Sequence, residues 1–526
     1  MVARQLIARL EVLPTKRVLV LMVGIFGLVH LGYYLAGVRF DVVPLVRFFQ
    51  FLDPELLRHR LAESLFYLHS QPPLFNLFLG IVLKLFPRHE AIAFHTTYLA
   101  LGLVLYLALF TLMRRLGISR IVALALSTWF IVSPSFVLYE HWLFYTLPLA
   151  AILTLSVLLF HQVLEARTAW AALGFFTSLF LLSGIHSMFH LAYCLVAMGA
   201  VLVLCRGQRR MILLTAAFPL LLIASLPTKN LVLFGEFATS SWAGMNLSGP
   251  TLRAVPIEER ERLVAAGKLS RLALIPRFSR LTSYPQEYVR VRGFEGIPAL
   301  RQVRKSTGFG NYNHLAYVAI SRQYLKDDLH VLLHYPKYAL AGWLNAWLRY
   351  FRSTSDYGFF HGNLAKIVPV NVLYDYLFYG KVPRCRVQLD DLPIHYAPYR
   401  ESRLYVFLLI GLPLLLVLGF RTALRERRTG LSLDRDQRML LLYLCLNVAF
   451  VAVVGNILEV GENQRFRFAT DPLDVVLLGL LVEQLRRRRG PVQGTGVTDT
   501  GRQPAEGRES RVTPQGCAVA AQPALD

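Results

Sequence analysis

Apolar runs long enough to form membrane-spanning helices recur along most of the chain. The hydrocarbon core of a bilayer needs about 20 mostly apolar residues per helix, with a range of about 17–25. Ten runs meet or approach this length: Val18–Ala36, Ala91–Met113, Ile121–Leu138, Leu143–Gln162, Ala169–Ser183, Ser187–Leu204, Met211–Leu226, Ser402–Phe420, Met439–Leu458 and Phe468–Leu485. The pattern therefore predicts an all-α protein that crosses the membrane many times.

Three further apolar stretches do not fit this scheme directly. Pro73–Phe86 is too short to span and carries Lys84 near its end, which predicts a helix lying on or dipping into the outer face. Leu329–Trp347 and Leu364–Tyr379 lie inside a large polar region. Because the flanking topology requires an even number of spans there, either both stretches cross the membrane or neither does. The expected total is ten to twelve spans.

Basic residues concentrate in the short segments between the predicted spans. With ten spans and both termini inside, every dense basic patch in a short loop falls on the cytoplasmic side. These patches contain Arg114, Arg115, Arg120, Arg167, Arg206, Arg209, Arg210, Arg421, Arg425, Arg427, Arg428 and the run Arg486–Arg489. The net charge of +23 is therefore attributed to membrane orientation, and no nucleic-acid partner is expected. An arginine-rich, lysine-poor composition favours a bacterial inner (plasma) membrane.

The spans divide the chain into five parts. They are a cytoplasmic N-terminal tail (1–17), an N-terminal transmembrane module (18–226) with its first outside loop at 37–90, a large extracytoplasmic region (227–401), C-terminal transmembrane helices (402–485) and a disordered cytoplasmic tail (486–526). The tail is rich in Gly, Thr, Gln, Pro and Ala, a composition that does not support a packed core. The two outside regions are longer than connections require, so the chemistry is expected there.

Acidic residues on the outer side are the candidate chemical groups. Asp41 follows the first span in an apolar setting that places its carboxylate at the membrane surface. Asp53 precedes a Pro-Glu pair, an arrangement that also fits a helix N-cap. Glu140 and His141 fall at the outer end of a span, where a charge is costly and is a functional hypothesis by default. An ordinary carboxylate facing water is the alternative for Glu140.

Neither a metal site nor a cofactor is expected. His186 and His190 lie one helical turn apart near the outer side, and such a pair is a possible half of a metal site. No third ligand lies nearby in the sequence, so two polar side chains packed at a helix break are the favoured interpretation. The chain also lacks a Walker A loop, which argues against ATP-driven transport.

The segment His69–Leu74, with the sequence HSQPPL, resembles an element of a known class of enzymes. It is similar to the His-x-Pro-Pro-Leu element after the first loop of GT-C class glycosyltransferases, which include the protein O-mannosyltransferases and the lipid A aminoarabinose transferases. Further features occur in a similar order: a helix ending in Arg114-Arg115, a helix running to Ser133-Pro134, an acid at Glu140 and an arginine-rich segment, Glu462–Phe468, before the last helix. The similarity covers about Val18–Asn230 and, more loosely, the C-terminal part.

This resemblance implies a GT-C-like helical bundle and an inverting glycosyltransferase that uses a polyprenyl-phosphate sugar on the extracytoplasmic face. A carboxylate of the first outside loop would take the proton from the acceptor hydroxyl, and the lipid phosphate would leave. Asp41 is the first candidate for this base, Asp53 the second, and Glu140 a further catalytic carboxylate. Relatives often carry two adjacent acids at the position where this chain has Asp41 followed by Val42.

The same resemblance indicates which residues would bind substrate. His69 and Gln71 belong to the HSQPPL element, and His69 has a purely structural role as its alternative. Arg465 and Arg467 precede the last helix on the outer side and would hold the lipid phosphate, since guanidinium groups stabilise phosphate charge well. Headgroup anchoring is the alternative for both arginines. The acceptor, whether a lipid, a glycan or a protein, is left open.

Two other functions fit parts of the sequence. A transporter or flippase for a lipid-linked sugar would be expected to show repeated halves and charges inside helices, but no internal repeat is evident. A polymerase or ligase that joins lipid-linked glycans would be expected to carry its chemistry in the largest outside loop. The clustering of acids in the first outside loop favours the transferase.

Overall fold

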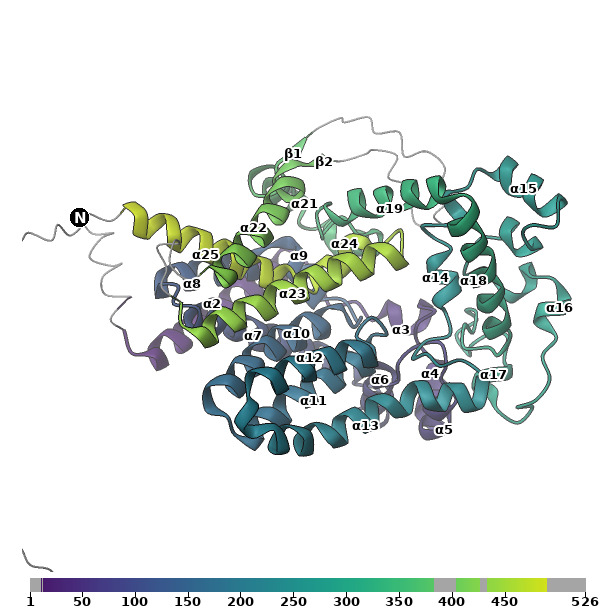
Figure 1. Cartoon of the computed structure of the whole chain (residues 1–526), viewed down its shortest axis with the longest axis horizontal. Coiled ribbons are helices and arrows are strands. Elements are labelled where there is room, and N and C mark those ends of the chain that lie inside the picture. Colours follow the sequence, from purple (N-terminus) through teal and green to yellow (C-terminus); the bar gives the residue numbers. More distant parts are fainter. Residues whose placement is uncertain (1–10, 12, 383–403, 426–432, 490–526) are drawn as a thin grey trace, which may run out of the picture. The chain divides into compact units, whose positions relative to one another are not determined.

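The helices that the hydropathy pattern predicts are present in the computed structural model, which describes residues 11, 13–382, 404–425 and 433–489 (Figure 1). Six helices are long and apolar enough to cross a membrane. They are α2 (Thr15–Leu35), α7 (Glu90–Arg115), α10 (Thr146–Ala166), α13 (Arg209–Phe234, preceded by the turn η1, Arg206–Gln208), α22 (Val406–Leu424) and α23 (Arg435–Leu458). The chain is thus an all-α, multi-pass membrane protein, as predicted.

A seventh span is broken in the middle. The predicted segment Ile121–Leu138 forms two helices, α8 (Arg120–Val132) and α9 (Pro134–Glu140), which meet at an angle of 60°. Pro134 has no N–H to continue the helix, and Ser133 adopts an extended conformation and caps α9 by accepting a hydrogen bond from the N–H of Phe136 at 3.2 Å. The Ser-Pro pair therefore ends one helix and starts the next in a new direction.

The remaining predicted segments also form helices, but these are shorter or more charged. They are α11 (Ala169–Ile185), α12 (Leu191–Leu204) and α25 (Asp471–Arg489). Pro73–Phe86 forms the twelve-residue α6 (Leu74–Leu85). The total of ten spans therefore stays a prediction. The N-terminal tail, apart from its last few residues, and the C-terminal tail after Arg489 lie outside the described residues.

Twelve spans find no support in the structure. The stretch Leu329–Trp347 is divided at Tyr335 between two helices, and Leu364–Tyr379 contains only a ten-residue helix. The outer regions consist of such short helices: α3 (Val43–Arg47), α4 (Pro54–His59), α5 (Leu61–Phe66), α14 (Ala243–Leu247), α15 (Ile257–Ala265), α16 (Gln286–Val289), α17 (Pro298–Arg301), α18 (Ala316–His334), α19 (Pro336–Tyr350), α20 (His361–Leu364), α21 (Val368–Leu377) and α24 (Asn463–Phe468).

Few other elements occur among the described residues. Four 3-10 turns lie in the outer region: η2 (Leu252–Ala254), η3 (Arg271–Leu274), η4 (Leu281–Ser283) and η5 (Gly358–Phe360). The two strands β1 (Lys381–Val382) and β2 (Leu404–Tyr405) pair antiparallel, with Lys381 opposite Tyr405. The rest of the described chain consists of helices and the turns and loops that connect them.

Loops that the charge pattern assigns to one side of the membrane do lie together. Arg115, at the end of α7, forms an ion pair with Glu165 at the end of α10 (2.5 Å), and its carbonyl accepts a hydrogen bond from Gln437 at the start of α23. Arg487, near the end of α25, donates to the carbonyl of Gly117 at 3.0 Å. These contacts join loops far apart in the sequence at one end of the bundle.

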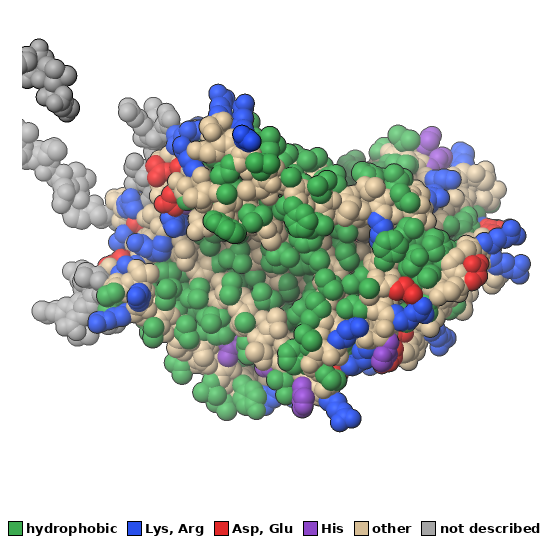
Figure 2. All heavy atoms as spheres, turned by 90° about the horizontal axis from the view of Figure 1, so that it is seen from below, with side chains coloured by type: hydrophobic (Ala, Val, Ile, Leu, Met, Phe, Trp, Pro, Cys, Tyr) green, Lys and Arg blue, Asp and Glu red, His purple; other side chains and the backbone are tan. Residues whose placement is uncertain are grey.

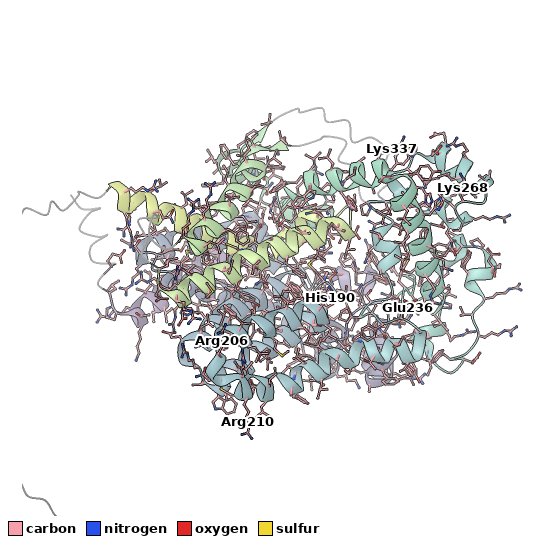
Figure 3. All side chains as sticks on the ribbon, viewed as in Figure 1. His190, Arg206, Arg210, Glu236, Lys268 and Lys337 are labelled. Carbon is pink, nitrogen blue, oxygen red and sulfur yellow. The ribbon has the colours of Figure 1, made fainter. Side chains whose placement is uncertain are left out.

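The opposite end carries the large outer region. In Figure 3, Arg206 and Arg210 lie near the start of α13, whereas Glu236 lies just beyond its other end. Lys268 and Lys337 lie on the same side as Glu236. The short basic loops and the large polar region thus occupy opposite ends of the helices, which agrees with the predicted sidedness.

A band of exposed apolar side chains separates the two ends. Figure 2 shows hydrophobic groups covering the middle of one face, with most charged groups toward its ends. On α12 and α13, Val196, Leu214 and Phe218 are 74%, 68% and 67% exposed. Soluble proteins rarely expose contiguous apolar surface of this kind, whereas lipid-facing helices require it.

Glycines allow close backbone contacts within the outer region. Gly342 in α19 lies against Pro250, so that a Cβ at this position would collide with the Pro250 backbone oxygen. Gly244 in α14 lies in the same way against the backbone of Ser321 in α18. The segment around Gly244, whose neighbour Trp242 is buried, is therefore a packed part of the outer core.

We expect Gly342→Ala to destabilise the protein by about 1–3 kcal/mol, because the backbone of Pro250 cannot move aside as a flexible side chain would. Thermal unfolding in detergent would measure the effect. Gly362→Ala, at a position with open space around it in the same region, is the matched control and should unfold like the wild type. Equal melting temperatures for the two variants would contradict the close packing of α19.

Candidate functional site

A short non-helical strip connects α9 to α10 and supports the candidate site. The strip, residues 141–145, follows Glu140, the last residue of α9. Asp41 pairs with it as an isolated parallel bridge to Trp142: the Asp41 N–H donates to the carbonyl of His141 at 2.8 Å, and the N–H of Leu143 donates to the carbonyl of Asp41 at 3.0 Å. The first candidate base is therefore held by its backbone against the end of the broken span.

The carboxylate of Asp41 is half-buried and has few partners. Its Oδ1 accepts the N–H of Val43 at 2.8 Å, the pattern of an Asx turn that starts α3. Burial raises the pKa of Asp41, although the Val43 N–H and the charge of Arg47 act in the opposite direction. A carboxylate with a raised pKa is a stronger base than an ordinary aspartate.

Arg465 packs against the other end of the strip. Its guanidinium carbon lies 4.9 Å from the ring centre of Phe144, 5.4 Å from that of Tyr145 and 4.8 Å from that of Phe466. Its Nε and Nη2 donate to one carboxylate oxygen of Glu462, at 3.0 and 2.5 Å. Arg465 is thus a buried cation in an aromatic setting, and Glu462 is its ion-pair partner among the described residues.

Glu462 is the member of the Arg465–Glu462 ion pair that is in contact with solvent. Its side chain is 22% exposed, whereas that of Arg465 is 4% exposed. Tyr357 donates a hydrogen bond to Glu462 Oε1 at 2.9 Å, and its ring packs on Trp142. Burial disfavours the charged form of Arg465, but Glu462 more than offsets this, so the pKa of Arg465 lies well above its ordinary value.

Asp53, the second candidate base, is engaged by the protein itself. It caps α4 by accepting the N–H of Glu55 at 3.1 Å, as the alternative interpretation predicted. Ser306 donates its N–H and its hydroxyl to the two oxygens of Asp53, at 2.6 and 2.5 Å. Next to it, the buried Lys305 donates to the carbonyl of Phe48 at 2.7 Å. Asp53 therefore ties the first outside loop to the large outer region.

Burial also changes the basicity of Lys305. It lowers the pKa of its amine to about 7, although the nearby carboxylate of Asp53 acts in the opposite direction. Both groups lie at the junction of the two outer regions, and Phe48, which Lys305 binds, packs its ring on Trp142 of the 141–145 strip. No signal in the sequence pairs Asp53 with residues more than 250 positions away.

His69 joins the same two regions at a second point. It is fully buried, and its ring nitrogens contact the hydroxyl of Ser241 at 2.7 Å and the carbonyl of Asn313 at 3.0 Å. Both nitrogens are thereby used within the protein, which fits the structural alternative for this residue. Gln71 is half-buried, and its side chain makes no hydrogen bond with any described residue.

Arg467 is likewise enclosed. It is 1% exposed, donates from Nε to Asp471 at 3.0 Å and from Nη1 to the carbonyl of Tyr350 at 2.7 Å. Its partner Asp471 is 18% exposed, close to the 22% of Glu462, so the two arginines do not differ in the exposure of their carboxylates. Of the two arginines expected to bind phosphate, only Arg465 lies beside the strip that holds Asp41.

Glu140 is fully buried at the end of α9 and forms an ion pair with His30 of α2. The other carboxylate oxygen, Oε1, has no hydrogen-bond partner among the described residues. The alternative of a carboxylate facing water is therefore wrong. Sequence reasoning missed His30, although a single histidine within the first apolar run is itself a signal of function.

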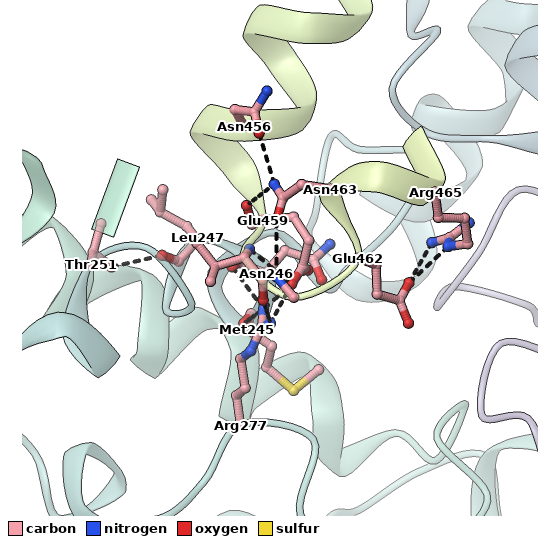
Figure 4. A network of polar contacts seen from close by, with 12 residues as sticks. Met245, Asn246, Leu247, Thr251, Arg277, Asn456, Glu459, Glu462, Asn463 and Arg465 are labelled. Carbon is pink, nitrogen blue, oxygen red and sulfur yellow. Dashed lines mark hydrogen bonds and ion pairs between the residues drawn. The ribbon is translucent and has the colours of Figure 1, made fainter. Parts of the chain in front are cut away.

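A half-buried ion pair between Arg277 and Glu459 fastens the large outer region to the end of α23 (Figure 4). Arg277 lies between the carbonyls of Met245 and Asn246, and its Nη1 donates to Glu459 Oε2 at 3.0 Å. Asn463 donates to the carbonyl of Glu459 at 2.9 Å and so closes the turn that leads to Glu462 and Arg465. Burial raises the pKa of Glu459, and Arg277 counters the effect. The role of Arg277 was not readable from the sequence.

The described part of the chain contains no arrangement of side chains suited to binding a metal ion. No three side chains of the types His, Cys, Asp and Glu are grouped there in a way that would hold an ion. His186 is half-buried against Tyr145 and Phe466, whereas His190 is exposed at the start of α12. Only His186 takes part in the packing near Arg465.

The buried imidazole of His69 predicts a pH-dependent stability. Burial lowers its pKa from 6.5 to about 3, so the unfolded chain binds a proton below pH 6.5 that the folded chain does not. The free energy of unfolding therefore falls as the pH falls through this window, by up to about 1.4 kcal/mol per pH unit from this group. In His69→Gln this part of the slope should disappear, as measured by unfolding at several pH values.

The control for this measurement is His59→Gln, which removes an exposed imidazole from the same outside loop. It should retain the slope of the wild type. A slope in His69→Gln equal to that of the wild type would mean that His69 is accessible to protons in the folded protein.

Comparison with known proteins gives no relative on which to base a function. No family model, no curated protein and no solved structure matches the chain. The functional argument therefore rests on the residues and on their geometry.

Proposed function

We propose that this protein is a membrane glycosyltransferase that moves a sugar from a polyprenyl-phosphate donor to a hydroxyl group of a lipid, glycan or protein on the extracytoplasmic face. The observation that carries the proposal is the 141–145 strip. It holds a half-buried carboxylate, Asp41, at Trp142 and a buried cation, Arg465, on Phe144 and Tyr145. A transfer of this kind requires one base and one cation that stabilises the negative charge on the leaving phosphate.

In the proposed reaction Asp41 acts as the general base. It takes the proton from the acceptor hydroxyl, whose oxygen attacks the anomeric carbon from the face opposite the phosphate. The bond between the anomeric carbon and the phosphate oxygen breaks, and its electron pair stays on the phosphate. The configuration at the anomeric carbon is thereby inverted, and the lipid phosphate remains in the membrane.

Arg465 is proposed to stabilise the leaving phosphate. Its aromatic neighbours exclude water, which strengthens its attraction for an anion. Glu462 neutralises Arg465 in the structure and is the more exposed partner. The donor phosphate would bind beside Glu462 or take its place, while Tyr357 keeps Glu462 within reach.

The geometry gives less support to the other catalytic assignments. Asp53 uses both oxygens to hold Ser306, and Glu140 is fully enclosed beside His30. Neither carboxylate is open to an acceptor. A flippase for a lipid-linked sugar and a glycan polymerase or ligase remain as outcomes that the following experiments distinguish.

Asp41→Asn should lower sugar transfer by about 10²–10⁴-fold, because the amide cannot accept the proton of the acceptor. The amide oxygen still accepts the N–H of Val43, so the fold should be retained. The assay offers the purified protein radiolabelled polyprenyl-phosphate sugars together with extracted membrane acceptors and follows transfer of the label.

Glu295→Gln is the matched control, since Glu295 is an exposed carboxylate that accepts one backbone N–H, from Gly293, in the large outer region. It should transfer label at the wild-type rate. Equal transfer by Asp41→Asn and the wild type would exclude Asp41 as the base and leave Asp53 as the next candidate. No transfer by any form, with movement of labelled lipid between leaflets of vesicles, would replace the transferase by the flippase.

Arg465→Lys should lower kcat/KM for the lipid donor by about 10²-fold, because an ammonium group loses the planar stacking on Phe144 and Tyr145 and one of two hydrogen bonds. Initial rates at varied donor concentration would show the change. Arg322→Lys, which alters an ion pair with Glu236 in the outer region, is the control. Unchanged kinetics in Arg465→Lys with intact stability would remove Arg465 from the site.

A further inference from the structure

A group of titratable side chains lies at the outer ends of the spans. His30 comes from α2, His95 from α7, Glu140 from the end of α9, and His141 from the first position of the strip. The side chain of Glu140 is 0% exposed, and that of His30 is 12% exposed. Groups of this kind are expensive to keep within a membrane and mark ion or proton paths more often than packing.

The four side chains form a continuous series of contacts. Glu140 Oε2 pairs with the Nε2 of His30 and lies 3.9 Å from the Nδ1 of His141. The ring of His141 lies between the other two rings, with its centre 5.9 Å from that of His30 and 5.2 Å from that of His95. Such spacings are bridged by one water molecule or by a small rotation of a ring.

Two buried polar atoms in this group have no partner among the described residues. They are Oε1 of Glu140 and Nε2 of His95, and they lie at the two ends of the series. Buried polar atoms are nearly always hydrogen-bonded in proteins, so unpaired ones at both ends of a connected series require an explanation. Gly102 of α7 faces Glu140 Oε1 and keeps the space beside it free of a side chain.

The series lies beside the backbone of the proposed base. Phe40 packs on the ring of His95 with a centre distance of 5.2 Å, and the next residue, Asp41, is bonded through its N–H to the carbonyl of His141. His95 is half-buried near the outer end of α7, so it is the member closest to solvent. Arg39 is the remaining charged group that acts on His141.

A purely structural role explains these contacts less well. One ion pair would be enough to fasten α2 to α9, and an apolar pair of the same size would do so without the cost of desolvating two charges. A purely structural link between α2 and α9 would not require two additional histidines in contact with the Glu140–His30 pair. The arrangement resembles instead the Asp, Glu and His chains through which protons move in membrane proteins.

We propose that His95, His141, His30 and Glu140 form a proton relay between the outer solvent and the buried Glu140–His30 pair. Nδ1 of His30 and Nδ1 of His141 donate to the carbonyls of Phe26 (2.7 Å) and Val137 (2.9 Å), so each of these rings takes up and releases the excess proton at Nε2, and one water molecule or a ring rotation carries it to the next member. This part of the inference rests on the proposed function: the relay accepts from Asp41 the proton that Asp41 has taken from the acceptor hydroxyl. It returns that proton to the outer solvent between turnovers, which restores the Asp41 carboxylate.

The relay is tested without any substrate. Time-resolved infrared spectroscopy after a pH jump, on the full-length protein in nanodiscs, follows the carboxyl and imidazole bands, and Glu140→Gln identifies the carboxyl band by its loss. His95→Phe keeps the ring contact with Phe40 and breaks no hydrogen bond of the described structure. We expect it to slow protonation of the Glu140–His30 pair at least tenfold while leaving the final intensity of the Glu140 carboxyl band unchanged.

His190→Phe, at an exposed histidine outside the series, is the control and should keep the wild-type rate. His141→Phe is the second variant and should slow the same step. Wild-type rates in both relay variants, or a pair that does not change protonation between about pH 4 and 9, would overturn the relay. If the relay is confirmed but the protein transfers no sugar, the relay stands and the proposed function fails. If the protein transfers sugar but shows no relay, the proposed function stands and the relay fails.

Discussion

The break at Ser133-Pro134 is the constraint on which the candidate site depends. A backbone inside or at the edge of a bilayer must satisfy its hydrogen bonds within the protein, because lipid offers no partners. The proline removes one donor, and the serine side chain caps the new helix. The chain then leaves α9 after Glu140, and its free backbone groups are satisfied by pairing with Asp41. The Asp41 loop is thus placed by the geometry of a broken span.

The large outer region is held to the spans by arginines that meet carboxylates. Arg277 pairs with Glu459, and Arg465 with Glu462, within the turn between α23 and α24. Pairs buried to this degree add little net stability, since the desolvation of both charges offsets their attraction. Their value lies in specificity, because any other docking of the outer region would leave a buried charge without a partner. The same turn carries the cation of the candidate site.

The two outer regions are joined at points away from this turn. Asp53 holds Ser306, and His69 contacts Ser241 and Asn313. These residues resemble functional groups when read singly, because buried acids and histidines are uncommon. Their partners show that they fasten one polar loop to another, and we therefore assign the proposed chemistry to the carboxylate and the cation at the 141–145 strip. The histidines beside Glu140 belong to the proposed relay.

The sequence by itself determined the helices and the class of protein. Hydropathy is a local property, so the apolar runs that it marks are mainly helical, although Ile121–Leu138 and Leu329–Trp347 are each divided between two helices. The N-cap at Asp53 followed from the Pro-Glu pair after it. The tertiary structure alone decided which polar residues meet. His30 and Glu140 are 110 positions apart, and Arg277 and Glu459 are 182 apart. No local pattern encodes such pairs, because a charge buried at the end of a helix is satisfied by whichever distant segment the packing of the helices brings to it.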